Sequence, residues 1–335
     1  MNRNILLLFI GLTRLVPSFA QMPSGTSKEH VLFFVSVDSS NYLLTQKHPT
    51  NVDSFEYGLV ARNVEAINSP QKEFAPVYYE NGLVFASTGR LGILQRSGEG
   101  YSNLYFSPFD PNGNPTIPQM FSLSLTSPKN EGPVTFSRDF KTIYYTQNNN
   151  KNGVAKAGKD GKVHLKIYWA TAGDRDWERH GALPFCSADY SCLSPSLSMD
   201  GKRLYFASDM PGGFGGYDLY FSELDASGSW TSPVNLGPNI NTDQDDLSPF
   251  ISQTGTLFFA SAGHNSLGGR DLFFSNATPD GFSTIVNLGS PFNTPANESS
   301  IILDAEEGSG FFVSEREHGF GKSDIYRFTK EFVRK

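Results

Sequence analysis

By residue type and spacing, two histidines are the best candidates for residues that bind a ligand. His264 lies six residues before Arg270, and His318 lies four residues before Lys322. Both fall at equivalent points of two neighbouring repeats described below, so with the two cations they could share one rim and bind a metal ion or an anion. Two loop histidines without a third fixed ligand are more often solvated, so we expect no metal ion and no cofactor.

Three aspartates recur at the start of equivalent segments: Asp218 in DLY, Asp271 in DLF and Asp324 in DIY. A carboxylate in this position can accept hydrogen bonds from the glycine-rich loop before it and so fix that loop. We expect a structural role, because equivalent positions on successive repeats do not converge on one substrate. Asp200 and Gly201 likewise predict a turn between two strands, since Asp-Gly favours the positive φ of a tight hairpin.

The first twenty residues have the pattern of a secretory signal peptide. Arg3 precedes an apolar run over residues 5–12, and the sequence Ser18-Phe19-Ala20 suits cleavage before Gln21. The run is too short to span a bilayer, and no later stretch is long and apolar enough to do so. We therefore predict an exported protein without a transmembrane segment, periplasmic or associated with the outer membrane, with an extracellular location as the alternative. Residues 21–54 form an unassigned extension.

The two cysteines, Cys186 and Cys192, lie six residues apart in FCSADYSC. In an exported protein this pair predicts a disulfide that closes a short loop. The stretch supplies too few ligands for a metal site and has the wrong spacing for a C-x-x-C redox motif.

Charge and motifs disfavour several classes of function. The formal net charge of −7 offers no basic surface to a phosphate backbone, which disfavours nucleic acid as a partner. The sequence has no G-x-S-x-G elbow, no H-E-x-x-H, no P-loop and no dinucleotide fingerprint. We therefore predict that the protein is not an enzyme.

These candidate residues belong to a repeat that runs through the chain. An aromatic strand segment occurs five times, centred on Phe85, Tyr145, Phe206, Phe259 and Phe312, at intervals of 60, 61, 53 and 53 residues. One copy divides into a hairpin with strands at 195–198 and 203–208, a glycine-rich loop, and two more strands at 217–223 and 230–236. Four antiparallel strands in a unit of roughly 50–60 residues are typical of a β-propeller blade.

The number of blades follows from the incomplete last copy. The fourth-strand segments VNLGPNINT and VNLGSPFNT follow the third and fourth copies, and the chain ends after Asp324-Ile325-Tyr326 without one. The similar ARNVEAINSP at 61–70 precedes the first copy, so an N-terminal strand can complete the last blade and remove both open edges. We predict an all-β propeller of five four-stranded blades over residues 55–335. A sixth blade built from VLFFVSV and NYLLTQ is the alternative.

The repeat resembles the TolB-like, WD-type propellers of cell-envelope proteins. Within that group it is similar to the propellers of Bacteroidota envelope proteins that carry an OmpA-like domain, including the PorE-type component of type IX secretion. The segments that carry this resemblance are NEGPVTFSRDFKTIYYTQNN, SPSLSMDGKRLYFASDMPGGFGGYDLYFS, VNLGPNINT and GRDLFFS. The resemblance implies an envelope protein whose partners are outer-membrane, OmpA-like or secretion-apparatus proteins.

Two functions remain open from the sequence. The first is a non-enzymatic interaction module that docks an envelope protein through propeller loops, with the insertions at 107–120 and 148–161 as candidate contacts. The alternative is a secreted carbohydrate-active enzyme or lectin with a site in the central funnel. The alternative predicts carboxylates, histidines or arginines that converge in the funnel, whereas the first predicts small or apolar groups there.

Overall fold

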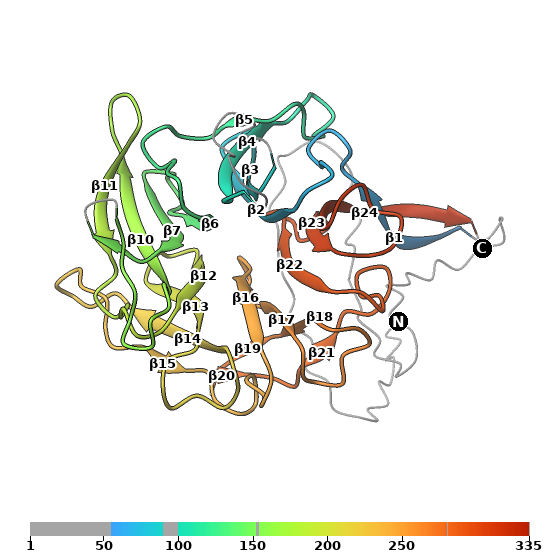
Figure 1. Ribbon diagram of the computed structural model, residues 1–335. Coiled ribbons are helices and arrows are strands. Elements are labelled where there is room, and N and C mark those ends of the chain that lie inside the picture. The colour runs from blue at the N-terminus through green and yellow to red at the C-terminus, as the bar shows by residue number, and fades with distance from the viewer. Residues whose placement is uncertain (1–54, 90–99, 152–153, 280, 335) are drawn as a thin grey trace, which may run out of the picture.

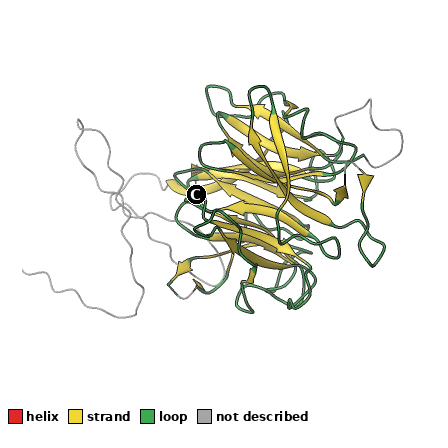
Figure 2. Ribbon diagram, turned by 90° about the vertical axis from the view of Figure 1, so that its left-hand side faces the viewer, coloured by secondary structure: helices red, strands yellow, loops and turns green. Residues whose placement is uncertain are grey.

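The chain forms a ring of five antiparallel sheets, which we name blades A to E in ring order (Figure 1). The computed structural model describes residues 55–89, 100–151, 154–279 and 281–334. Within these residues there is no helix, and hence none that could cross a membrane (Figure 2). The signal peptide, the extension and the proposed sixth-blade strands lie outside the described residues.

The strands of each blade follow one another in sequence from the centre of the ring outward, except in blade E. Blade A contains β2 (Glu73–Tyr79), β3 (Gly82–Ser87), β4 (Asn103–Pro108) and β5 (Gln119–Met120). Blade B contains β6 (Glu131–Phe136), β7 (Thr142–Asn148), β10 (Leu165–Ala172) and β11 (Trp177–Ala182). Blade C contains β12 (Cys192–Leu197), β13 (Arg203–Ser208), β14 (Asp218–Glu223) and β15 (Val234–Asn235).

Blade D contains β16 (Asp246–Ile251), β17 (Leu257–Ser261), β18 (Asp271–Ser275) and β21 (Val286–Asn287). Blade E contains β22 (Glu298–Leu303), β23 (Ser309–Ser314), β24 (Asp324–Arg334) and, as its outermost strand, β1 (Phe55–Asn63). Two small hairpins lie outside the blades, β8 (Asn150–Lys151) with β9 (Val154–Ala155) and β19 (Ala277–Thr278) with β20 (Gly281–Phe282).

Blade E closes the ring with strands from both ends of the chain. β1 pairs antiparallel with β24, and Asn63 lies opposite Tyr326 as Asn235 lies opposite Tyr220 in blade C. The prediction of five blades completed by an N-terminal strand is therefore confirmed. Closure gives β24 a partner on each side, β23 and β1, so that β24 is not an edge strand.

The outermost strand of blade C is shorter than the sequence predicts. The segment 230–236 is expected to be one strand, but only Val234 and Asn235 form a regular strand against β14. On either side, the Thr231 N–H donates to the Glu223 carbonyl and the Leu236 N–H to the Leu219 carbonyl, while Pro233 has no N–H to donate. Gly237, with a φ of 83°, then turns the chain out of the blade.

The core repeats with the blades. The five aromatic residues at the repeat centres are each at most 1% exposed, and each packs against an aromatic residue of the next strand. The ring centroids of these pairs lie 5.5–6.1 Å apart; the pairs are Phe85–Tyr105, Tyr145–Tyr168, Phe206–Tyr220, Phe259–Phe273 and Phe312–Tyr326. Burial of such side chains stabilises the fold by about 1.5–3 kcal/mol each.

We expect Phe259→Ala to lower the free energy of unfolding by about 3–5 kcal/mol, because it removes a fully buried ring and leaves a cavity. The matched control is Phe214→Ala, since Phe214 is 50% exposed and its loss should change stability by roughly 0.5 kcal/mol or less. Chemical denaturation of both variants measures the difference. Equal stability of the two variants would contradict the assignment of Phe259 to the core.

Candidate functional site

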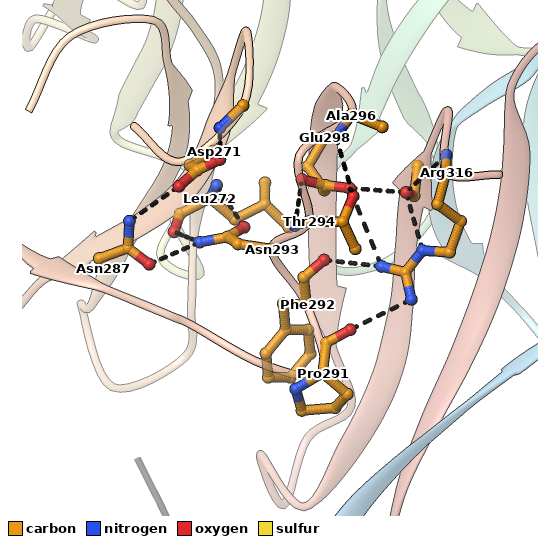
Figure 3. A network of polar contacts seen from close by, with 12 residues as sticks. Asp271, Leu272, Asn287, Pro291, Phe292, Asn293, Thr294, Ala296, Glu298 and Arg316 are labelled. Atoms are coloured by element: carbon orange, nitrogen blue, oxygen red, sulfur yellow. Dashed lines mark hydrogen bonds and ion pairs between the residues drawn. The ribbon is translucent and has the colours of Figure 1, made fainter. Parts of the chain in front are cut away.

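The three repeated aspartates hold the loops that precede them. Asp218 accepts hydrogen bonds from the N–H groups of Phe214 and Gly215, at 2.6 and 3.1 Å, and from the Asn235 amide at 2.8 Å. Asp271 makes the equivalent contacts (Figure 3), as does Asp324. All three side chains are at most 1% exposed, so they lie within the blades.

A second amide, which the sequence analysis did not single out, completes each of these networks. The Asn241 Nδ2 donates to Asn235 and to the Leu219 carbonyl, and its Oδ1 accepts from the Leu219 N–H at 2.7 Å. Asn293 and Asn68 take the same place in blades D and E. The signal in the sequence is Asn241 of NINT and Asn293 of PFNT, each six residues after the Asn of VNLG.

A further set of buried acids lies at the junctions between blades. The innermost strands of four blades begin with an acid that is 0% exposed; we call these the junction acids: Glu73, Glu131, Asp246 and Glu298. Each accepts from a Ser or Thr four residues earlier and from a polar side chain at the end of the second strand. These four are the only charged residues of the innermost strands, so those strands bring no accessible carboxylate to the centre of the ring.

The structure places the four residues of the predicted rim site in different surroundings. The His264 imidazole Nε2 donates to the Ile240 carbonyl at 2.8 Å and its ring packs on Phe259 and Phe273, whereas His318 is exposed. Arg270 is half-buried and Lys322 is exposed. The rim site stays a prediction. No group of three or more potential metal ligands occurs in the described part of the chain.

Cys192 stands where the other junctions have an acid. Its thiol lies 3.8 Å from the Ser208 hydroxyl, and both cysteines are free thiols here. Burial is the largest effect on Cys186 and disfavours its thiolate, but Cys192, the Ile167 backbone and Lys166 together outweigh burial and lower the pKa of Cys186. Interaction with Cys186, followed by burial, raises the pKa of Cys192. The disulfide between them stays a prediction.

A polar pocket lies in blade B, away from the innermost strands. It has a volume of about 590 Å³, and no residue of an innermost strand lines it. We call it the blade B pocket; its walls are Thr126–Lys129, Tyr145, Asn150, Tyr168 and Arg179–Gly181. A smaller pocket of about 300 Å³ lies beside it, against Tyr79, Phe106, Met120 and Trp177.

Blade B has this pocket because it departs from the repeat. In blades D and E the aromatic pair is covered by His264 and by Arg316, whose guanidinium lies 4.9 Å from the Phe312 ring centroid. In blade B the pair is Tyr145 with Tyr168, and the cation comes instead from the outermost strand as Arg179. Both rings of the pair therefore bring hydroxyl groups to the lining of a pocket.

Two cations of the pocket differ in how they are held. Arg179 donates from Nη2 to the Gln147 Oε1 at 2.8 Å and from Nε to the Tyr145 hydroxyl at 3.2 Å. Lys129 is only 8% exposed, yet it has no hydrogen bond or ion pair with any residue that the structure describes. Lys129 therefore places at the wall of the pocket a positive charge that forms no ion pair with the described residues.

Glu131 lies below the pocket and is the least satisfied of the junction acids. Its Oε1 accepts from Ser127 and from the Gln147 amide at 2.9 Å, whereas Oε2 has no hydrogen-bond partner among the described residues. Burial raises the pKa of Glu131 to about 7, against the lowering effect of these hydrogen bonds and of Arg179. The pocket thus combines two cations with a carboxyl group that is largely protonated below neutral pH.

Comparisons with known proteins show the fold and no family. No protein-family model matches the chain, and no curated protein matches it in sequence. Similar solved structures include TolB from Acinetobacter baumannii, with a TM-score of 0.43 and 13% identity over 79% of this chain. The match spans 56% of TolB. The likeness agrees with the predicted TolB-like propeller; the narrower resemblance to PorE-type proteins stays a prediction.

Other similar structures are glycoside hydrolases. An α-L-arabinofuranosidase from Lactobacillus brevis has a TM-score of 0.46 and 11% identity, over 78% of this chain and 90% of its own. A thermostable family-43 glycoside hydrolase has a TM-score of 0.49 and 14% identity, over 80% of this chain and 92% of its own. These matches contradict the prediction that the chain is not an enzyme, which relied on missing motifs. Propeller enzymes place their chemistry in scattered residues that such motifs do not detect.

The cysteine pair gives a prediction for oxidising conditions. We expect Cys186 and Cys192 to form a disulfide when the protein is exposed to oxidised glutathione, because the two thiols are close enough to change each other's pKa and that of Cys186 is lowered. Both thiols lose a proton and the two electrons pass to the glutathione disulfide. Mass spectrometry of unreduced peptides should show the two residues linked, and Cys192→Ser should abolish the link. Two alkylatable thiols after prolonged oxidation would contradict the prediction.

Glu131 gives a pH-dependent prediction. Its raised pKa means that the folded state holds a proton that the unfolded state releases, so this carboxyl destabilises the fold as pH rises from about 4.5 to about 7. Glu131→Gln removes that dependence and should gain stability relative to the wild type over this range. At about 1.4 kcal/mol per pKa unit, the gain reaches roughly 3 kcal/mol at most.

Urea unfolding at several pH values between 4.5 and 8 measures this difference. The control is Glu223→Gln, which removes an acid whose side chain is 51% exposed. A constant difference between wild type and Glu131→Gln across the range would show that Glu131 has an ordinary pKa.

Proposed function

We propose that the protein binds carbohydrate, and that the blade B pocket is the binding site. The observation that carries the proposal is a polar pocket of about 590 Å³ that contains a nearly buried lysine without a partner. This volume lies in the range of sites for small ligands. The lining offers donors and acceptors of several kinds: the Asn150 amide, the Tyr168 hydroxyl, the Lys129 ammonium and the Arg179 guanidinium.

The choice of carbohydrate rests on the density of these polar groups beside aromatic rings. A sugar presents a hydroxyl on almost every carbon, and each buried hydroxyl needs a hydrogen-bond partner. Tyr145 and Tyr168 supply hydroxyls at the ends of stacked rings, and the His180 ring packs on Trp169 with centroids 4.1 Å apart. Such a lining matches a ligand that has polar edges and apolar ring faces.

Binding is the step that the pocket supports directly. Most glycoside hydrolysis uses two carboxyl groups on either side of the bond that breaks. Among the described residues around this pocket we find one carboxyl, Glu131, which lies beneath the walls. Hydrolysis is therefore measured separately from binding in the experiment below.

Export and the envelope partners are proposals that only the sequence supports. The signal peptide lies outside the described residues, and a location in the periplasm or at the outer membrane would place the protein among cell-surface glycans. Docking of an OmpA-like or secretion-apparatus protein through the propeller loops is compatible with the fold, but it uses no feature of the blade B pocket.

A glycan array, followed by calorimetry with the glycans retained, tests the proposal. We expect Asn150→Ala to weaken binding about five- to tenfold, as the loss of a hydrogen bond of roughly 1 kcal/mol predicts. Asn265→Ala, an exposed asparagine on blade D, is the matched control and should bind as the wild type does. Release of reducing ends in the same incubations would reveal hydrolysis. Retention of no glycan at millimolar concentration would overturn the proposal.

A further inference from the structure

Lys129 sets the strongest constraint on what the blade B pocket can bind. Its side chain reaches the pocket from the loop just before β6 and is 8% exposed. No described residue accepts a hydrogen bond from it or pairs with its charge. An ammonium that lines a pocket without an ion pair favours an anionic ligand, because no carboxylate of the pocket wall competes for it.

The acid nearest in sequence does not supply that counter-charge. Glu131 is two residues away, but its Oε1 is taken by Ser127 and Gln147, and no ion pair joins Oε2 to Lys129. In the other three junction acids, the second carboxyl oxygen accepts a backbone N–H: Ser69 to Glu73, Thr242 to Asp246 and Thr294 to Glu298. Arg179 favours the ionised form of Glu131, but burial has the larger effect and raises the pKa of Glu131 to about 7. No ion pair among the described residues joins Glu131 to either cation.

Arg179 adds a second positive group in a fixed orientation. Three of its donors are directed at protein atoms: Nη2 at Gln147, Nε at Tyr145 and, at 3.5 Å, Nη1 at the Ser124 carbonyl. All three acceptors are neutral, so the guanidinium keeps its full charge. A guanidinium held in this way still has N–H groups for a planar anion, and it matches carboxylate geometry better than an ammonium does.

We infer that the carbohydrate bound in the blade B pocket is acidic, and that its carboxylate lies between the Lys129 ammonium and the Arg179 guanidinium. This inference rests on the proposed function and specifies its ligand as a sugar acid of the uronic class. The carboxylate supplies the counter-charge that the protein lacks at this point. Asn150 and Tyr168 also line the pocket, and the Tyr168 hydroxyl accepts hydrogen bonds from the Asn150 N–H and Nδ2. The Tyr168 hydroxyl proton and the Asn150 Oδ1 are the groups that can contact hydroxyls of the same sugar ring.

Calorimetry with a matched pair of ligands tests the inference on the intact protein. One ligand is an acidic trisaccharide, used in galacturonate, glucuronate and mannuronate forms, and the other is its methyl ester, which has the same shape and no charge. We expect at least one acid to bind ten times or more tightly than its ester. The affinity for the acid should also fall as sodium chloride is raised.

Two variants assign the effect to the pocket. Lys129→Met keeps the length and apolar volume of the side chain, and Arg179→Gln keeps hydrogen bonding without charge; each should weaken binding of the acid about tenfold or more and leave binding of the ester nearly unchanged. Lys202→Met, which removes an exposed lysine on blade C, should bind both ligands as the wild type does. Thermal unfolding of each variant shows whether its fold is intact.

The possible outcomes separate this inference from the proposed function. Equal binding of acid and ester, binding of neutral glycans alone, or unchanged acid binding by a folded Lys129→Met would overturn the acidic ligand and leave carbohydrate binding in place. Preference for a sulfated over a carboxylated sugar would overturn the assignment of a carboxylate. Failure of every glycan, charged or neutral, would overturn the proposed function itself.

Discussion

Buried hydrogen bonds between polar side chains and backbone hold this ring together. Blades C, D and E each contain one such network, made by an aspartate at the start of the third strand and two asparagines. The network joins three segments: the loop before the third strand, the third strand itself, and the segment that contains the two asparagines. A buried polar group that loses its partner costs about 1–3 kcal/mol, so each network is stable only when complete. In blade E, Asn63 and Asn68 come from the start of the chain and complete a network around Asp324, more than 250 residues away. Ring closure therefore uses the same chemistry as every continuous blade.

The sequence predicts the features that repeat with constant residue types. Five aromatic centres, the spacing of the third-strand aspartates and the incomplete last copy together specify five blades and the N-terminal closing strand. The junction acids are not predicted because the residue type at this position varies: it is Glu or Asp in four blades and Cys in blade C. The bulge that follows this position also interrupts the alternation of buried and exposed residues along the strand. His264 and His318 occupy equivalent positions in the repeat but have different surroundings, which the sequence does not indicate: His264 covers an aromatic pair, whereas His318 faces solvent.

The blade B pocket escapes prediction for a different reason. Its walls come from the loop before β6 and from three strands or their ends, and their polar residues match no motif. Insertions in blade B also obscure the register that would align its residues with those of the other blades. Only the fold shows that Tyr145 and Tyr168 are the aromatic pair of this blade and that Arg179 approaches them from the outermost strand.

Blade B also lacks the network that stabilises blades C to E. Lys166 lies opposite Gln147 where blade C has Asp218 opposite Ser208, and Ala182 stands where blade C has Asn235. This blade therefore cannot fix its loop through the same carboxylate and amides, and it keeps an unpaired lysine and a half-satisfied glutamate instead. Buried polar atoms without a hydrogen bond also occur elsewhere among the described residues, at Asn103 Oδ1 in blade A and Ser300 Oγ in blade E. Blade B differs because its half-satisfied acid lies beside a pocket lined by two cations, and local inconsistency of this kind is expected at functional sites. This combination is the reason that we propose blade B as the site of ligand binding.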